Sequence, residues 1–159
     1  MMRVGHGFDA HRLVADRPFI LGGVTIPFER GPLGHSDGDA LTHAICDALL
    51  GAAALGDLGA HFPDTDPQWE GADSLTLLAA VHEQLVRHGW TIANIDATVV
   101  VQAPKLSPHI AAMRDALAET LTLDIGKISV KAKTSEGMGY TGDGSGIAAH
   151  AVALLTALV

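Results

Sequence analysis

Apolar and polar positions divide the chain into segments with the periodicity of strands and segments with the periodicity of helices. Residues 2–8, 90–102 and 127–133 are rich in β-branched residues or alternate between apolar and polar, and we predict strands there. Residues 19–28 predict a short hairpin that turns at Gly22-Gly23. These four segments would supply most of a sheet.

Three helices are expected from apolar residues that recur every three or four positions and from capping signals. The first covers about 37–55, since Ser36 followed by Asp39 resembles a capping box at its start. The other two cover about 74–88 and 108–121. Turn-rich loops separate them, so helices alternate with strands along the chain.

Residues 147–158 fit a buried strand and a buried helix equally well, because periodicity does not separate the two here. The alternation of elements predicts an α/β fold of the two-layer α+β kind, in one domain over residues 1–159. The chain is 48% hydrophobic but only 4% aromatic, so its core would consist of alanine and aliphatic side chains. A chain this apolar is expected to bury one face in an oligomer.

The net charge of −8 argues against sequence-independent binding to nucleic acid. Any anionic substrate must therefore be held by local donors or by metal ions. Cys46 is the only cysteine, which excludes an intrachain disulfide and gives no sign of secretion. With no apolar run of about 18 residues, we predict a cytoplasmic protein that does not enter a membrane.

A candidate metal site is formed by Asp9, His11 and His43. Residues two apart on a strand point to the same side, so Asp9 and His11 can reach one ion, and His43 lies on the first predicted helix. Two imidazoles and one carboxylate suit Zn²⁺ with one coordination position left open, the pattern of catalytic zinc. The competing interpretation is an aspartate that caps a turn at the end of a strand.

The first helix carries a polar stripe of Asp39, His43 and Asp47, spaced four apart on one face. Asp47 or Asp39 would orient a metal ligand from behind, unless the stripe is simply the solvated side of the helix. His35 and Ser36 precede this helix, where backbone amides favour phosphate; the alternative is a plain cap and an exposed loop.

Three further loops offer polar groups. In the first loop, Asp64 and Asp66 would bind a cation or sugar hydroxyls, or would form an ordinary turn. Lys105, at a junction between strand and helix, would meet a phosphate or a base, or would be solvated. Thr134 offers a hydroxyl and Glu136 a carboxylate for Mg²⁺, ahead of a glycine-rich stretch whose amides can approach a ligand closely.

Five stretches of this sequence carry a specific family pattern, in family order and across most of the chain. They read RVGHGFDAH, GHSDGDALTHAICDALLGAAALGDLG, HFPDTDP, QAPKL and KTSEGMGYTG. Together they resemble the 2-C-methyl-D-erythritol 2,4-cyclodiphosphate synthase family of the non-mevalonate isoprenoid pathway. The resemblance implies a homotrimer of subunits with a mostly four-stranded mixed sheet, helices on one face, and residues 147–157 as a strand.

The resemblance also implies a reaction. The 2-phosphate of 4-diphosphocytidyl-2-C-methyl-D-erythritol 2-phosphate attacks the β-phosphorus, expels CMP and closes a cyclic diphosphate, which makes the enzyme a phosphorus-oxygen lyase. The active sites lie between subunits. Zn²⁺ is held by Asp9, His11 and His43, and Mg²⁺ or Mn²⁺ by Glu136 together with the substrate phosphates. His35 and Thr134 stabilise the transition state.

The residues implied to contact substrate fall in four groups along the chain. They are Asp9, Ala10, His11, His35 and Ser36; then Asp57, Leu58, Gly59, Phe62, Pro63, Asp64, Thr65 and Asp66; then Val101, Gln102, Ala103, Pro104, Lys105, Leu106 and Ser107; and finally Lys133, Thr134, Ser135, Glu136, Tyr140 and Asp143. The third group matches the family's cytidine pocket.

The chain departs from the family pattern in its last glycine-rich loop. Asp143 stands where many members have a basic residue linked to phosphate binding, so we expect no axial site for isoprenoid diphosphates. Lys133 stands where some members have threonine, and we expect it to supply a positive charge near the substrate phosphates. Ser135 and Gly137 are expected to make the loop looser.

Two other functions remain open at this point. A zinc-dependent phosphoesterase would use the same ligands but add water, and would release hydrolysed phosphate instead of a cyclic diphosphate. A non-enzymatic trimeric binding module would show no metal-dependent turnover.

Overall fold

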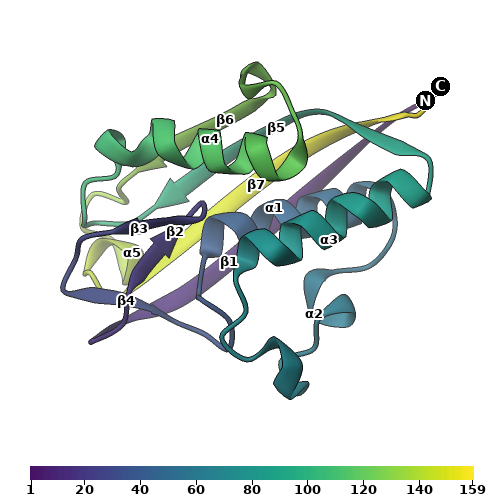
Figure 1. The fold of residues 1–159 in the computed structure, drawn as a ribbon. Helices are drawn as coiled ribbons and strands as arrows, with labels where there is room; N and C mark the ends of the chain where they lie inside the picture. Colours follow the sequence, from purple (N-terminus) through teal and green to yellow (C-terminus); the bar gives the residue numbers. More distant parts are fainter.

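Five strands form the central sheet of the computed structural model, which describes residues 1–159 (Figure 1). Their order is β4-β1-β7-β5-β6, and only β5 and β6 run parallel. The bounds are β1 Met2–Ala15, β4 Arg30–Leu33, β5 Trp90–Val100, β6 Ile128–Lys133 and β7 Gly146–Ala157. The mixed α/β class is confirmed.

The expected count of four strands is wrong because of β4, which pairs with the end of β1. Its sequence, RGPL, has neither alternation nor β-branched residues. Pro32 is tolerated because β4 is an edge strand, where one side needs no ladder hydrogen bonds. Strand β1 also extends past its predicted end at residue 8 to Ala15. The predicted hairpin is confirmed as a separate two-stranded sheet of β2 Phe19–Leu21 and β3 Val24–Ile26.

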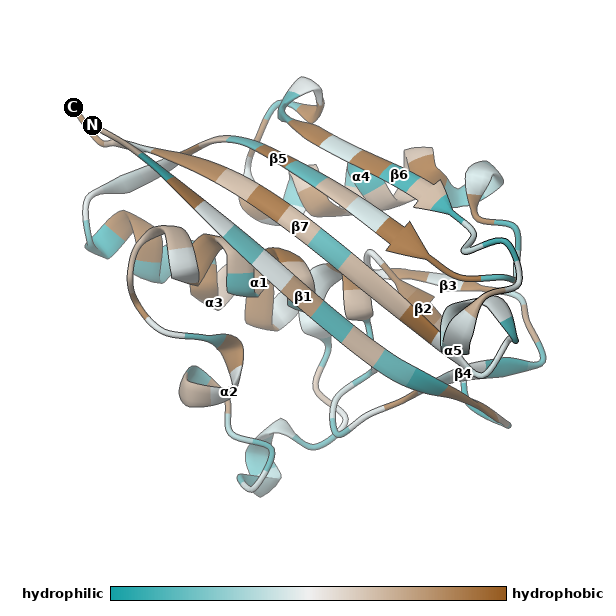
Figure 2. Ribbon diagram, turned by 180° about the vertical axis from the view of Figure 1, so that it is seen from behind, coloured by the Kyte–Doolittle hydropathy of each residue, from teal (hydrophilic) through white to brown (hydrophobic).

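The three long helices cover one face of the sheet and leave the other face open (Figures 1 and 2). They are α1 Ala40–Ala52, α3 Ser74–Arg87 and α4 Ile110–Leu121. The core lies between these layers and is aliphatic, as predicted. The remaining turns of helix are α2 Leu58–His61, α5 Gly139–Gly142, η1 Pro67–Trp69, η2 Ser107–His109 and η3 Ile125–Lys127. No helix has both the length and the apolar character needed to span a bilayer.

Helix α1 lies directly on β1 because two glycines on that strand have no side chain. A Cβ on Gly5 would overlap the backbone carbonyl of Ala48, and one on Gly7 would overlap that of Ala44. Close approach of this kind is what glycine permits. It brings the helix that carries His43 against the strand that carries Asp9.

Strand β7 is rich in alanine, yet it is a strand, as the family resemblance implies. Ala149, Ala151 and Ala153 are buried and pair with Asp9, Gly7 and Gly5 of β1. Small side chains are needed here because α1 packs close to this part of the sheet. The high alanine content of β7 therefore reflects tight packing against α1 and does not indicate a helix.

Helix α1 begins three residues later than predicted, and its N-cap is Asp39, not Ser36. The Asp39 carboxylate accepts from the Thr42 amide at 3.0 Å and from the amides of Gly22 and Gly23 at 2.9 and 2.8 Å. This fully buried side chain thus joins α1 to the β2–β3 hairpin. The helix also ends at Ala52, before the predicted Leu55.

Candidate active site

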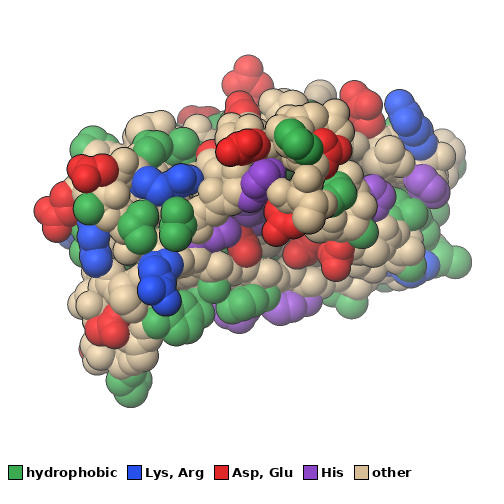
Figure 3. Space-filling model, turned by 90° about the horizontal axis from the view of Figure 1, so that it is seen from below, with side chains coloured by type: hydrophobic (Ala, Val, Ile, Leu, Met, Phe, Trp, Pro, Cys, Tyr) green, Lys and Arg blue, Asp and Glu red, His purple; other side chains and the backbone are tan.

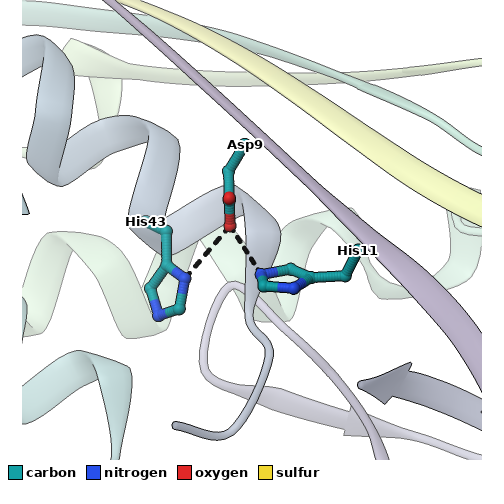
Figure 4. A group of neighbouring side chains, drawn as sticks. All are labelled: Asp9, His11 and His43. Atoms are coloured by element: carbon teal, nitrogen blue, oxygen red, sulfur yellow. Dashed lines mark hydrogen bonds and ion pairs between the residues drawn. The ribbon is translucent and has the colours of Figure 1, made fainter. Parts of the chain in front are cut away.

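The three predicted metal ligands converge on one point between β1 and α1 (Figure 4). Asp9 Oδ2 lies 2.7 Å from His11 Nε2 and 3.1 Å from His43 Nδ1. One ligand atom from each residue lies within 4.8 Å of the other two. The spacing of two along β1 and the close approach of α1 therefore build a three-ligand cluster, as the sequence predicts.

The tautomer of His11 leaves a lone pair directed at this cluster. Its Nδ1 lies 3.1 Å from the Leu33 carbonyl, which can only accept, so Nδ1 carries the proton. Its Nε2 is buried and makes no hydrogen bond, although Asp9 is close. In the neutral ring, Nε2 is then an unsatisfied acceptor beside a carboxylate, and a bound cation would satisfy both groups. The residues present therefore fit a divalent metal.

His43 is held from behind by Ser74, a residue that sequence reasoning missed. Ser74 Oγ lies 2.8 Å from His43 Nε2 and donates its own proton to the carboxylate of Asp37. The hydroxyl must then accept from Nε2–H. Nδ1 is left to face Asp9, where it donates to the carboxylate when protonated and offers its lone pair to a metal when neutral. Ser36 Oγ also lies 3.0 Å from Nε2. Such outer hydrogen bonds fix a ligand's tautomer and raise its basicity.

Charges in the cluster reinforce one another. Burial works to raise the pKa of Asp9, but the imidazoles of His11 and His43 outweigh it and hold that pKa below its usual range. Burial works to lower the pKa of His43, but the hydrogen bond and charge of Asp9 outweigh it and raise that pKa. The cluster therefore favours positive charge at its centre, which a proton or a metal ion can supply.

The rest of the polar stripe on α1 does not reach the ligands. Asp39 is buried at the hairpin joint described above. Asp47 Oδ1 accepts from the Leu58 amide at 2.7 Å and so ties α2 to α1. Its contact is thus with the backbone of a predicted substrate loop, and not with His43 as we had expected of an orienting residue.

The predicted phosphate position at the start of α1 is also occupied by the chain itself. Asp37 accepts from the Asp39 amide at 3.1 Å, and Asp39 accepts from the amide of Thr42. These carboxylates would repel an anion there. His35 is exposed beside this turn, with its carbonyl accepting from Gly71 at 2.9 Å.

A cavity of about 400 Å³ opens over the metal ligands. Figure 3, a view from below, shows histidine and acidic side chains gathered near the middle of that face. The lining contains most of the first two predicted substrate groups together with two unforeseen apolar residues, Trp69 and Leu77. It comprises Asp9, His11, His35, Ser36, His43, Leu58, Gly59, Phe62, Pro63, Asp64, Trp69 and Leu77.

Four predicted contacts from the first two groups do not line this cavity: Ala10, Asp57, Thr65 and Asp66. Ala10 instead lines a hollow beside Arg12 and Arg30. Asp57 caps α2 by accepting from the Ala60 amide at 2.9 Å, and Asp66 caps η1 by accepting from the Gln68 amide at 3.0 Å. Both carboxylates thus have the turn-forming role that the sequence left as the alternative. Their hydrogen bonds shape the loop that carries Phe62 and Asp64.

A second cavity, of about 460 Å³, lies where β5 and β6 end. It collects the predicted cytidine group and the start of the last loop, and it is lined by Val101, Gln102, Ala103, Pro104, Lys105, Leu106, Ser107, Ala132, Lys133 and Thr134. Lys105 and Lys133 make no ion pair with any carboxylate of the chain. Their charges are therefore free for an anionic ligand.

The two cavities lie beside different strands of the sheet. Strand β1 carries Asp9 and His11, and β6 leads into Thr134, with β7 and β5 between them. Three strand spacings amount to roughly 14 Å. Within one chain, the metal ligands and His35 are thus together, whereas Thr134 and Glu136 are apart from them.

Hydrogen bonds within the chain hold the loop that follows β6. Ser135 Oγ donates to the Met138 carbonyl and lies 2.7 Å from Thr141 Oγ1. Ser135 therefore ties the two ends of the loop together, and a loop looser than in other family members stays a prediction. Glu136 is exposed and adopts a positive φ of 56°, and its amide lies 3.4 Å from Thr134 Oγ1.

Tyr140 and Asp143 lie beyond both cavities. Tyr140 lines a third hollow, beside Arg12 and Arg30. Asp143 is fully exposed and accepts from the Ser145 amide at 2.8 Å, and its hydrogen bonds with Ser145 lower its pKa. The absence of an isoprenoid diphosphate site stays a prediction.

Comparison with known proteins agrees with this geometry. A 2-C-methyl-D-erythritol 2,4-cyclodiphosphate synthase from Trichlorobacter lovleyi is 57% identical over 154 residues, which cover 97% of this chain and 98% of that one. A synthase structure described as a CDP-bound form is 42% identical, with a TM-score of 0.89 over 97% of this chain and 100% of the other.

The bifunctional IspDF from Campylobacter jejuni is 40% identical, with a TM-score of 0.96. The match covers 99% of this chain and 43% of that longer chain. The YgbB family model matches residues 2–156. Over residues 2–156, the chain therefore belongs to the YgbB family, the family of the 2-C-methyl-D-erythritol 2,4-cyclodiphosphate synthases.

Proposed function

We propose that this chain converts 4-diphosphocytidyl-2-C-methyl-D-erythritol 2-phosphate to 2-C-methyl-D-erythritol 2,4-cyclodiphosphate and CMP. The observation that carries the proposal is the buried, unsatisfied Nε2 of His11, which together with Asp9 and His43 forms the floor of a substrate-sized cavity. The relatives that share this chain's full length carry the name of that synthase.

The chemistry needs no nucleophile from the protein, because the attacking phosphate and the phosphorus it attacks belong to one molecule. The structure is consistent with this. The only thiol, Cys46, is buried in α1, and burial raises its pKa well above the usual value, so it stays protonated. Catalysis then rests on folding the substrate into a reactive geometry and on stabilising charge.

Zn²⁺ held by Asp9, His11 and His43, and Mg²⁺ or Mn²⁺ held by Glu136, would when bound supply Lewis acids that neutralise the phosphate charge. His35, at the exposed edge of the metal cavity, is placed to donate a hydrogen bond to a phosphate oxygen. Phe62 and Trp69 form an edge-to-face pair with ring centroids 4.9 Å apart beside it. Their rings would exclude water that competes with the attacking phosphate.

The two halves of this machinery would meet between subunits. A cation shared by two phosphates spans only a few ångströms, whereas the metal ligands and Glu136 of one chain are separated by three strand spacings. We therefore infer a homotrimer in which Thr134, Glu136 and the Lys105 cavity of one subunit complete the metal cavity of the next. CDP, which one solved relative binds, matches the nucleotide part of the substrate.

A single buried thiol suits the reducing cytoplasm, where we propose that this phosphorus-oxygen lyase works as one domain of residues 1–159.

Phosphorus-31 NMR of the products tests the proposal directly. We expect CMP and a cyclic diphosphate in the presence of Zn²⁺ and Mg²⁺, and neither product after dialysis against a chelator. Asp9→Asn, which removes a ligand charge with little change of shape, should abolish turnover.

Two outcomes would contradict the proposal. Release of a linear, hydrolysed phosphate would identify a phosphoesterase, in which water is the attacking group. Binding of CDP with no turnover under any metal condition would identify a binding module.

A further inference from the structure

The guanidinium of Arg17 holds the loop that connects β4 to α1. Its Nε donates to the Pro32 carbonyl at 2.9 Å. One of its terminal nitrogens lies 3.4 Å from the Gly34 carbonyl and 3.5 Å from that of Ser36 and donates to both. These carbonyls belong to alternate residues, so one planar fork of donors runs along one side of the loop. Sequence reasoning gave Arg17 no role.

The loop needs these donors because the sheet stops short of it. The ladder between β1 and β4 ends at the pair Arg12 and Leu33, so the carbonyls that follow have no strand partner. The two carbonyls between those bound by Arg17 are also paired. The Leu33 carbonyl accepts from His11 Nδ1 at 3.1 Å, and that of His35 accepts from the Gly71 amide at 2.9 Å. Each carbonyl from 32 to 36 thus has a donor.

Arg17 reaches the loop because Gly31 of β4 has no side chain. A Cβ on Gly31 would overlap the backbone carbonyls of Arg17 and Pro18. The turn after β1 therefore lies directly against β4. The Arg17 side chain is half-buried and makes no ion pair with any carboxylate of the chain. Its donors are committed to the loop.

Two residues of the candidate active site depend on this loop. His35 lies between two of the residues whose carbonyls Arg17 binds, and the Leu33 carbonyl selects the tautomer of His11. Asp9 lies on the other side of the His11 ring, 2.7 Å from Nε2 (Figure 4). Without the Leu33 carbonyl, the proton of the neutral ring would move to Nε2 and be donated to Asp9. The lone pair that a metal needs would then be lost.

We propose that Arg17 is a positioning residue, which acts through the loop of residues 32–36 on both His35 and His11. Arg17 does not itself line the metal cavity. The part of this inference that concerns His35 rests on the proposed function, whereas the effect on His11 is visible without substrate.

Steady-state kinetics test the effect on His35. Arg17→Gln should lower kcat about 10–100-fold and leave KM within about twofold, because a hydrogen bond made in the transition state is misplaced while the other substrate contacts remain. Arg17→Lys should recover only part of the loss, since an ammonium keeps the charge without the planar fork. Arg87→Gln, which changes an exposed arginine on α3, is the matched control and should behave as the wild type does.

Histidine ¹H–¹⁵N spectra of the metal-free protein test the effect on His11. At about pH 8, where ordinary imidazoles are neutral, wild-type His11 should carry its proton on Nδ1. In Arg17→Gln the proton should shift to Nε2. His88, whose Nδ1 lies 2.8 Å from the Gln84 carbonyl at the end of α3, should keep its tautomer in both proteins.

A wild-type kcat together with an unchanged His11 tautomer in Arg17→Gln would overturn the proposal. If Arg17→Gln does not fold, the same pair of results in Arg17→Lys would overturn it. Absent turnover in the wild type would instead contradict the proposed function, and the His11 tautomer would still decide the role of Arg17.

Discussion

Ser74 Oγ lies 2.8 Å from His43 Nε2, and this contact decides which nitrogen of His43 faces the metal position. The serine hydroxyl gives its proton to Asp37, so it can only accept from the imidazole. The ring is thereby fixed with Nδ1 toward Asp9, 3.1 Å away, so Nδ1 is the nitrogen that would bind a metal.

Ser74→Ala should therefore weaken metal binding without touching the metal. Loss of an outer hydrogen bond of this kind typically lowers affinity about 10–100-fold. Competition with a chromophoric zinc chelator would measure the change. Ser129→Ala, an exposed serine on β6, is the matched control and should bind as the wild type does. Equal affinity in Ser74→Ala would show that the contact has no orienting role.

The metal-free protein should show a pH-dependent stability that comes from Asp9 and His43. The raised pKa of His43 stabilises the fold below the ordinary histidine pKa, and this is lost as pH rises through the raised value. The lowered pKa of Asp9 stabilises the fold above the ordinary carboxyl pKa, and this is lost as pH falls.

The difference in Tm between metal-free wild type and His43→Gln should thus be greatest at about pH 5–6, between the ordinary pKa values of a carboxyl group and of histidine. It should shrink toward pH 8, where the imidazole loses its proton. Scanning calorimetry at several pH values, with chelator present, measures it. A difference that grows steadily up to pH 8 would contradict this assignment of charges.

Gly7→Ala should damage both the fold and the metal site. The new methyl group would meet the Ala44 carbonyl and push α1 away from β1, at a cost of about 1–3 kcal/mol. Zinc affinity should fall with it, because His43 moves with the helix. Denaturant unfolding and zinc titration on the same sample test both effects.

Gly51→Ala is the control for this substitution. Gly51 lies within α1, is exposed, and a Cβ there would meet nothing within 4 Å. Alanine should therefore stabilise the helix by up to about 1 kcal/mol and leave zinc affinity unchanged. If both substitutions behaved alike, close packing of α1 on β1 would not set the ligand geometry.

Lys133→Ala should raise KM for the substrate. Lys133 lines the cavity of Lys105 and Thr134 and has no carboxylate partner, so its charge is available for a phosphate. A charged hydrogen bond contributes about 1.5 kcal/mol, which corresponds to a rise of roughly tenfold. Lys127→Ala, in the turn before β6, should leave KM unchanged. Unchanged kinetics in Lys133→Ala would show that this charge does not serve the substrate.

The metal ligands were predictable because their geometry is local. Asp9 and His11 share one side of a strand by their spacing, and His43 lies on a helix with a clear apolar face. Ser74 gave no such signal, since a serine at the start of α3 is explained by helix capping alone. Its contacts with His43 and Asp37 exist only after α3 packs beside α1.

The fold was predictable where periodicity was strong and misleading where packing decided. Asp39 looked like the acidic residue that closes a capping box begun by Ser36. It is instead the N-cap itself, because two amides of the β2–β3 hairpin also donate hydrogen bonds to it. The edge strand β4 contains Pro32 and shows no alternation, so only its pairing with β1 reveals it. Strand β7 was predicted only through the family resemblance. Its alanines fit the narrow space beside Gly5 and Gly7, and this packing leaves no strand-like pattern in the sequence.

The carboxylate of Asp39, shared by α1 and the β2–β3 hairpin, couples the opening of these two elements. Helix α1 gains its N-terminal hydrogen bond at Thr42 from the same group that holds the amides of Gly22 and Gly23. The hairpin cannot detach without leaving a buried charge short of donors, and so the two elements should open as one unit in hydrogen exchange. A hairpin that contributes nothing to the cavity thereby governs how long His43 stays in place.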